Sequence, residues 1–444
     1  MICRSPSQPP SRTGSALVIV IWTIAIATVL MSSIQLFTSR QRMIGRDAVE
    51  TVRARWAARA GIEATLAVMA DHTLHPVSDD AFAMVAQMEQ AGVANGSINL
   101  ASWDIRHRSE DLESAFSGPM DEHSRLNLNS DHRGMLLTLL DISEWAGIIE
   151  AIEDWIDEDE EPRQLGVERD HYASLDVPFE PRNGPFQSIY ELELVAGITP
   201  VDVRGEDWNL NNRLDLNEDD GIASLPEDEP DGAMSHGWSS RLTVISRGEG
   251  ATASGERRLN LTETISEDLQ VRLGLLPEQA DALLSFAGSG SINLAILVYT
   301  PLPGAATSPD GDGFDPLTDE QITAIINECG GSPAHLPPWG KLNINTVSGP
   351  MLLDLMPDQE NLVNDILWLR GRTPQGIASL VELRDLPSAS SSDLQMLCEL
   401  FSTTSNVYTI TSRGRSEVTG QEVEIMATVD RSTVPARIVE YREQ

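Results

Sequence analysis

The first apolar block of the chain is long enough to cross a membrane. No charged residue stands between Arg12 and Arg40, and a helix needs roughly 20 mostly apolar residues to span a bilayer. Beyond this block the apolar positions return at helical spacing, and no proline occurs as far as Ala70. The pattern predicts one continuous helix over residues 15–70, about 80 Å long. Its first half would lie in a membrane, and its second half would pack on a soluble domain.

The polar leader before this block ends at Gly14, and no clear small-residue cleavage site follows the apolar residues, as it would in a secretory signal. This arrangement resembles a class III leader. A prepilin peptidase would cut after Gly14 on the cytoplasmic side and leave Ser15 as the first residue of the mature chain. Arginines at positions 40, 42 and 46 follow the span, so a charge count alone would place the C-terminal side in the cytoplasm. We give the leader more weight than this count.

Three segments together resemble the K-type minor pseudopilins of type II secretion systems (general secretion pathway protein K). They are Gly14–Trp22 (GSALVIVIW), Arg125–Asn129 (RLNLN) and Asp154–Asp159 (DWIDED). The resemblance implies an α+β fold, in which a pilin-like long N-terminal transmembrane helix lies on a small antiparallel sheet. Two helical SAM-like domains would be inserted into it, each followed by a β-hairpin.

The resemblance also implies a function and partners. The chain would be a minor pseudopilin at the tip of the pseudopilus, anchored once in the inner membrane with its C-terminal domain in the periplasm. There it would initiate assembly for protein export across the outer membrane, with the I-type and J-type minor pseudopilins and the major pseudopilin as partners. Most pilins and pseudopilins have Glu at position five of the mature chain. This chain has Ile19 there, and the K-type family is similar in lacking the Glu.

Two copies of one pattern occur along the chain. Arg125–Asn129 returns as Lys341–Asn345 (KLNIN), and alternating runs typical of a hairpin follow each copy. Asn127 and Asn343 stand just before predicted helices, where Asn satisfies free backbone N–H groups. The expected segments are a prepilin-type leader at 1–14, a transmembrane and stalk helix at 15–70, pilin-like strands at 71–118, a first SAM-like domain at 119–200, a calcium loop at 201–221, a β-hairpin at 238–266, a helix with loops at 267–338, a second SAM-like domain at 339–402 and a C-terminal β-hairpin at 403–444.

The charge of the chain excludes one class of partner. The 444 residues carry a net charge of −37, and such a surface repels nucleic acid because binding to phosphates depends on Lys and Arg. Of the three cysteines, Cys3 lies in the leader. Cys329 and Cys398 would remain in an oxidising compartment, where disulfides persist. Spacing leaves both possibilities open, a disulfide or two buried thiols.

One segment has the spacing of a calcium loop. Residues 207–218 (DWNLNNRLDLNE) place oxygen ligands at positions 1, 3, 5, 9 and 12 of the twelve-residue pattern. Position 6, normally Gly because φ is positive there, is Asn212, and Asn tolerates that region well. The alternative is a solvated acidic turn. The predicted ligands are the side chains of Asp207, Asn209, Asn211, Asp215 and Glu218, with the backbone carbonyl of Arg213.

The remaining motifs carry weaker signals. The acidic run at residues 157–161 is most simply a solvated loop, although a second calcium ion could bind there. The histidines are scattered, and no nucleophile elbow or phosphate loop occurs, so we expect no enzyme. Two function classes remain: a pseudopilus tip subunit, or a signal-anchored periplasmic binding or adhesion protein. A minor pilin of a related type IV pilus is a variant of the first.

Overall fold

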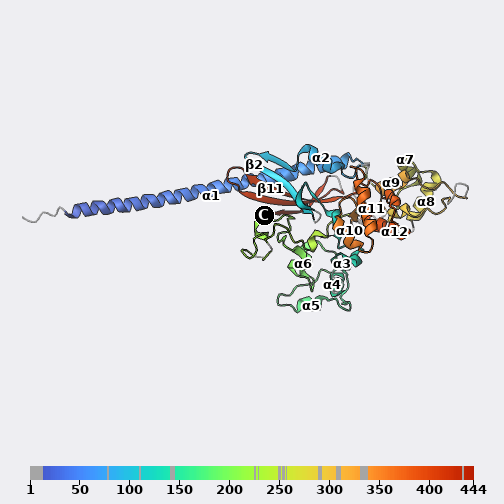
Figure 1. The fold of residues 1–444 in the computed structure, drawn as a ribbon, viewed down its shortest axis with the longest axis horizontal. Helices are drawn as coiled ribbons and strands as arrows, with labels where there is room; N and C mark the ends of the chain where they lie inside the picture. The colour runs from blue at the N-terminus through green and yellow to red at the C-terminus, as the bar shows by residue number, and fades with distance from the viewer. Residues whose placement is uncertain are drawn as a thin grey trace, which may run out of the picture.

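A single long helix dominates the computed structural model. Helix α1 (Gly14–Leu74) has 61 residues without a break and extends far from the soluble body (Figure 1). Its most apolar part is wholly unburied, and α1 is long and apolar enough to cross a membrane. The predicted continuous helix is therefore confirmed. The structure describes residues 14–77, 80–109, 112–140, 146–224, 227–228, 230–248, 252, 256, 258–288, 293–306, 312–330, 339–432 and 435–444, so the leader upstream of Gly14 lies outside it.

An antiparallel sheet packs on the second half of α1 (Figure 1). Its central strands run in the order β1-β2-β11-β12-β13, while β3 pairs with β2 and β4 pairs with β11. The strands are β1 (Asn95–Ile98), β2 (Ala101–Ser109), β3 (Leu112–Ser117), β4 (Met120–Asp121), β11 (Val407–Ser416), β12 (Glu422–Asp430) and β13 (Arg437–Glu443). The predicted α+β class, a long N-terminal helix on an antiparallel sheet, is confirmed. The segment expected to hold only strands, 71–118, also contains helix α2 (Ala83–Ala91).

Small residues bring α1 and the sheet into close contact. Ala54 and Ala58 on α1 are fully buried, and Gly414 of β11 lies directly against them. A Cβ atom added at Gly414 would stand 1.9 Å from the carbonyl oxygen of Ala54 and 2.6 Å from the amide nitrogen of Ala58. Because backbone atoms cannot move aside as a flexible side chain can, only glycine fits at this position.

Replacing Gly414 by Ala is therefore expected to destabilise the soluble part by about 1–3 kcal/mol, the usual range for overpacking. The reason is that α1 must move away from β11 to admit the methyl group. Gly134 is the matched control, since an added Cβ meets nothing within 4 Å there. Chemical unfolding of the two full-length variants in detergent measures the difference. Equal midpoints for Gly414→Ala and Gly134→Ala would contradict the proposed close contact.

Three helical modules lie between β4 and β11 in the chain, where the sequence predicted two. The first module contains β5 (Leu126–Asn127), α3 (Leu136–Leu139), α4 (Ala146–Ile156), α5 (Arg169–Ala173), α6 (Pro200–Arg204) and β6 (Leu242–Thr243). The second contains β7 (Leu259–Asn260), α7 (Ser266–Leu273), α8 (Pro277–Ala287), α9 (Asp319–Glu328) and β8 (Cys329–Gly330). The third contains β9 (Leu342–Asn343), α10 (Gly349–Leu355), α11 (Glu360–Gly371), α12 (Ser391–Leu400) and β10 (Phe401–Ser402).

Each module closes in the same way. Its first and last strands, two residues each, pair in parallel: β5 with β6, β7 with β8, and β9 with β10. In each module the first strand ends in Asn, and the Oδ1 of that Asn accepts a hydrogen bond from the backbone N–H of the residue two positions further on. These bonds measure 2.8 Å at Asn127, 3.1 Å at Asn260 and 2.9 Å at Asn343. The repeated Asn thus forms a turn that starts each module, and it does not cap a helix.

Two predicted segments need correction for this reason. The alternating runs at 238–266 do not form a hairpin among the described residues, because β6 pairs back to β5 and β7 pairs forward to β8. The segment 267–338, predicted as a helix with loops, holds most of the second module. That module was missed because its opening pattern, Leu259-Asn260-Leu261-Thr262, has Thr where the other copies have a second Asn.

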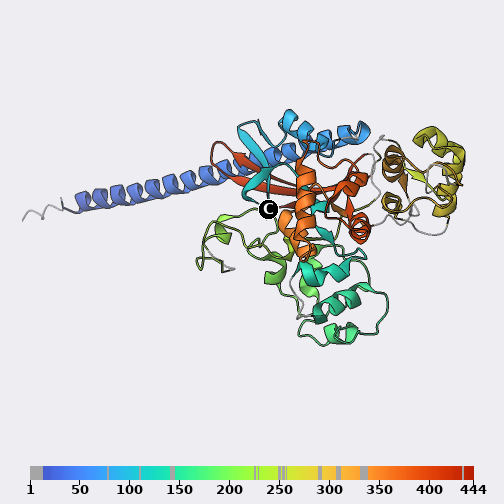
Figure 2. The same cartoon turned by 45° about the vertical axis from the view of Figure 1, so that its right-hand side comes forward.

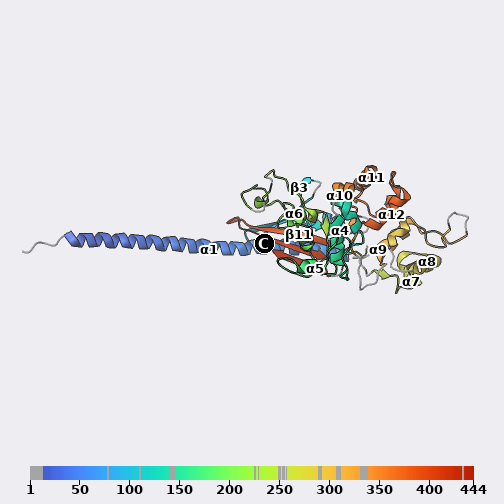
Figure 3. The ribbon, with the colours of Figure 1, turned by 90° about the horizontal axis from the view of Figure 1, so that it is seen from below.

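The modules spread over the end of the molecule away from the free half of α1 (Figures 2 and 3). The second module is a lobe at the far end, and the first lies on the other side of the sheet from α1 (Figure 2).

Cys329 ends the second module and Cys398 lies in α12 of the third. Both are buried and neither is in a disulfide, so the structure has two separate thiols. Burial raises the pKa of Cys329 to about 12 and that of Cys398 to about 11.

Candidate calcium centres

The predicted calcium loop follows α6 and lies against the sheet. Two arginines join it to the strands. The Nη2 of Arg413, on β11, lies 2.6 Å from Oδ1 of Asp215. From the loop itself, Arg213 reaches out to Asp104 of β2, with Nη1 and Oδ2 3.1 Å apart. The side chain of Arg213 is directed toward the sheet, so the backbone carbonyl is the group that this residue would offer to an ion.

Hydrogen bonds inside the loop draw its two ends together. The two carboxylate oxygens of Asp207 accept the N–H groups of Asn211 and Asn212, at 3.0 and 2.9 Å. At the other end of the loop, Glu218 accepts the N–H of Trp208 at 2.9 Å. Asp207, Asn211 and Glu218 are all buried. The first, fifth and twelfth residues of the motif are therefore held close together by the fold.

The backbone of the loop turns as the motif requires. Asn212, at position 6, has φ of 57°, which is the left-handed region that the motif normally assigns to Gly. Leu210, at position 4, has φ of 53°, which is unusual for a bulky residue and stores strain. Strain of this kind persists only where surrounding contacts hold it. The two residues shape the loop into a tight coil around its polar side chains.

The charges in the loop favour a bound cation. Burial, followed by the nearby Glu218, raises the pKa of Asp207 to about 7. Burial acts to raise the pKa of Asp215 as well, but the guanidinium of Arg413 and the amides of Asn209 and Asn211 together outweigh it and lower that pKa. Asp215 also accepts hydrogen bonds from the amides of Asn209 and Asn211, both at 2.9 Å. A hard cation would replace these amide donors and relieve the repulsion among the carboxylates.

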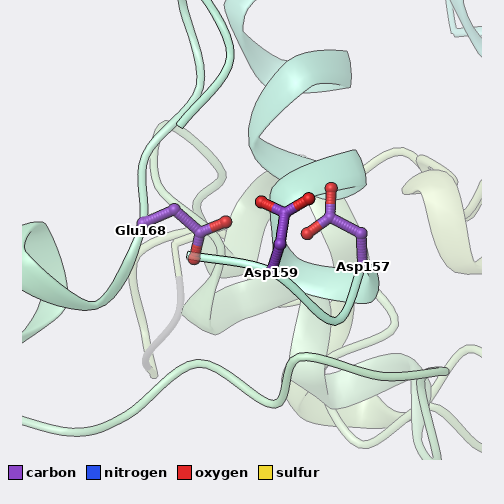
Figure 4. Close-up of side chains that lie close together, drawn as sticks. All are labelled: Asp157, Asp159 and Glu168. Carbon is purple, nitrogen blue, oxygen red and sulfur yellow. The ribbon is translucent and has the colours of Figure 1, made fainter. Parts of the chain in front are cut away.

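A second group of carboxylates lies in the first module. Asp157 and Asp159 follow α4, and Glu168 precedes α5. One oxygen from each lies within 4.8 Å of the others, and the three side chains converge (Figure 4). Glu168 is only 6% exposed. Among the described residues, neither of its oxygens has a hydrogen-bond partner, and the buried Oδ1 of Asp157 also has none.

Unpartnered buried carboxylate oxygens are costly unless a cation or a proton neutralises them. Burial, followed by the charges of Asp154 and Asp157, raises the pKa of Glu168 to about 7. One neighbouring cation, Arg163, lies beside this carboxylate group. It pairs with Asp154 at 2.5 Å, with Glu153 at 3.0 Å, and also with Asp157. The carboxylate oxygens that Asp157, Asp159 and Glu168 bring together are the kind of ligand that calcium prefers.

The comparisons with known proteins bear on this module. Residues 121–205 match a family model described as "Type II secretion system (T2SS), protein K". This segment, 85 of the 444 residues, is similar to the protein K family. Two of the motifs that suggested the resemblance, Arg125–Asn129 and Asp154–Asp159, lie inside the matched segment, so the resemblance is confirmed. No curated protein matches the chain.

One solved structure is similar over most of the chain. It is described as the GspK-GspI-GspJ complex from the type 2 secretion system of enterotoxigenic Escherichia coli. The matched chain is 12% identical, with 90% of this chain and 99% of that chain covered, at a TM-score of 0.45.

The protein K segment contains the whole of the second carboxylate group. The sequence indicated Asp157 and Asp159 as part of an acidic run, and the structure brings them together. Glu160 of the same run pairs instead with Arg169 at 2.9 Å. Glu168 was missed because it stands nine residues beyond Asp159, outside any ligand spacing. Its only local signal is its position immediately before a short helix.

Proposed function

We propose that this chain is a K-type minor pseudopilin at the tip of a type II secretion pseudopilus, where it initiates assembly for protein export. The observation that carries the proposal is the protein K segment at residues 121–205, set between strands β4 and β11 of a sheet that packs on one long apolar helix. A helix exposed along its apolar half suits membrane anchoring and later packing in a filament. The role is structural, and we assign no catalytic step to it.

The anchor and its processing form the second part of the proposal. Prepilin peptidase cuts after Gly14, and the mature chain begins at Ser15, with α1 crossing the inner membrane once. The soluble part then lies in the periplasm. The unbroken apolar helix downstream of Gly14 supports this arrangement, because cleavage after Gly14 would leave the membrane-spanning residues on the mature chain.

Calcium is the proposed cofactor. In the loop, Asp207, Asn209, Asn211, Asp215 and Glu218 would hold one ion together with the carbonyl of Arg213. In the protein K segment, Asp157, Asp159 and Glu168 would hold another. A calcium ion would supply the positive charge that neutralises these buried carboxylates. The ion in the loop would fix residues 207–218 against the sheet. The ion in the protein K segment would join the end of α4 to the start of α5.

The I-type and J-type minor pseudopilins and the major pseudopilin are the proposed partners, and Ile19 bears on the place of this chain among them. In pilins with Glu at position five, that carboxylate pairs with the N-terminal amine of a neighbouring subunit. A carboxylate at bilayer depth costs about 2.5–3.5 kcal/mol on insertion scales unless it has a partner. A tip subunit has no subunit above it to supply that partner, and Ile19 removes the need.

Labelled protein is therefore expected at one end of each pseudopilus, at a small fixed copy number. Immunogold electron microscopy of sheared filaments would measure its position. The major pseudopilin, labelled in parallel, is the control and should appear along the shaft. Finding this chain along the shaft at similar abundance would contradict the tip assignment. A mature chain that begins elsewhere than Ser15 would favour a signal-anchored binding or adhesion protein.

A further inference from the structure

We propose that Arg40, Arg42 and Arg46 form a collar that binds the phosphate groups of anionic phospholipids at the C-terminal end of the membrane span. The proposal rests on the membrane anchoring proposed above and adds the lipid class that the anchor selects. All three side chains are exposed on α1. They follow the apolar residues of the helix directly, at the level where a bilayer gives way to water.

The collar is slightly taller than the headgroup layer, and the reach of the arginine side chains makes up the difference. The rise from Arg40 to Arg46 is about 9 Å in a helix. The polar layer on each side of a bilayer is roughly 5–7 Å thick, the difference between its full thickness and its hydrocarbon core. Arginine also extends its guanidinium along the helix toward the interface while its stem stays on apolar surface. The three groups can therefore all reach phosphate in a single leaflet.

The next three arginines of α1 are in a different situation. Each of them is paired within the protein. Arg53 lies 2.6 Å from Glu50, Arg55 lies 2.5 Å from Glu443 of β13, and Arg59 lies 3.5 Å from Glu63.

No ion pair connects Arg40, Arg42 or Arg46 to an acidic group among the described residues. Arg46 donates one hydrogen bond, 3.1 Å from its Nη2 to the carbonyl of Val418, which leaves its other N–H groups available. Asp47 is the single acidic residue between Gly14 and Val49. The collar therefore keeps a net positive charge that the rest of α1 does not.

The distribution around the helix favours lipid over a protein partner. At about 100° per residue, Arg42 and Arg46 lie on one side of α1 and Arg40 lies nearly opposite. A protein docking on the helix would cover one side only, whereas headgroups surround it. Each basic residue near an anionic membrane surface strengthens the binding of the protein to that surface roughly fivefold. The collar is thus a local attraction in a chain whose net charge of −37 otherwise repels anionic lipid.

Lipid selection by the full-length chain tests the proposal. The chain is reconstituted into nanodiscs of phosphatidylglycerol mixed with phosphatidylcholine, and into discs of phosphatidylcholine alone. Native mass spectrometry then measures which lipids stay bound as the disc is stripped. The collar variant carries Arg40→Gln, Arg42→Gln and Arg46→Gln. The matched control carries the same change at the three paired arginines, Arg53, Arg55 and Arg59.

The unmutated chain is expected to retain phosphatidylglycerol in excess of its share in the disc, and added salt should reduce the excess. The collar variant should lose it, by roughly fivefold for each arginine, while the control keeps it. If the unmutated chain enters both kinds of disc but retains no excess of phosphatidylglycerol, the proposed collar is wrong and the membrane anchor still stands. Equal loss in the two variants also overturns it. A chain that enters neither kind of disc overturns the membrane anchor together with the collar.

Discussion

Removing calcium is expected to lower the melting temperature of the full-length chain in detergent by about 5–10 °C for each occupied centre. A ligand that binds only the folded state adds about 2.7 kcal/mol when present at 100 times its dissociation constant. For domains of 150–250 residues, 1 kcal/mol corresponds to about 2–4 °C. Differential scanning calorimetry with calcium, and then with a chelator, measures the shift directly.

Variants separate the two centres. Asp207→Asn with Glu218→Gln should remove the part of the shift that arises in the loop. Asp159→Asn with Glu168→Gln should remove the part from the protein K segment. Asp170→Asn is the control, because Asp170 is an exposed carboxylate in α5 close to Glu168 and should leave the shift unchanged. Equal melting temperatures with calcium and with chelator for the unmutated chain would contradict both centres.

Replacing Gly14 by Leu is expected to abolish maturation. The peptidase site must admit a small residue before the cut, so a bulky side chain should leave the full precursor in the membrane. Intact-mass measurement of the membrane fraction distinguishes the precursor, which keeps residues 1–14, from a mature chain that begins at Ser15. The effect should be close to complete, because Gly14 is the only glycine before the apolar block.

Gly14→Ala is the matched control for this experiment, since alanine is also small and should still be processed. A Gly14→Leu chain that matures normally would show that the leader has been misinterpreted. The soluble part would be unaffected in either case, because the N-terminal end of α1 extends far from the sheet (Figure 1). Failure to fold therefore cannot imitate failure to mature.

Local patterns were enough to predict some elements. Helix α1 could be predicted because its apolar spacing is contained within the helix itself. The twelve-residue loop is also local, since every proposed ligand lies between Asp207 and Glu218. The turn at Asn127 and its copy at Asn343 were visible as a repeated pattern, although their part in starting a module was not.

The features that were missed depend on pairing between distant residues. The run at Leu259–Asn260 alternates as a hairpin strand would, but its partner is Cys329–Gly330, about 70 residues away. No local pattern distinguishes these two pairings. Glu168 is similar, because only the path of the chain from α4 to α5 brings it to Asp157 and Asp159. Sequence periodicity reports which face of an element is buried, and it does not report what covers that face.

The position of Gly414 against Ala54 has a consequence for how the protein is made. The two residues are 360 positions apart (414 − 54). At 5–20 residues per second, roughly 20 to 70 s of synthesis separate them. During that time β11 is not yet available to cover Ala54 and Ala58 on α1. The three modules, each closed by its own pair of short strands, can fold before β11 is synthesised. Strands β11, β12 and β13 are thus the last part of the sheet to be made, and the sheet is completed only after the three modules have been synthesised.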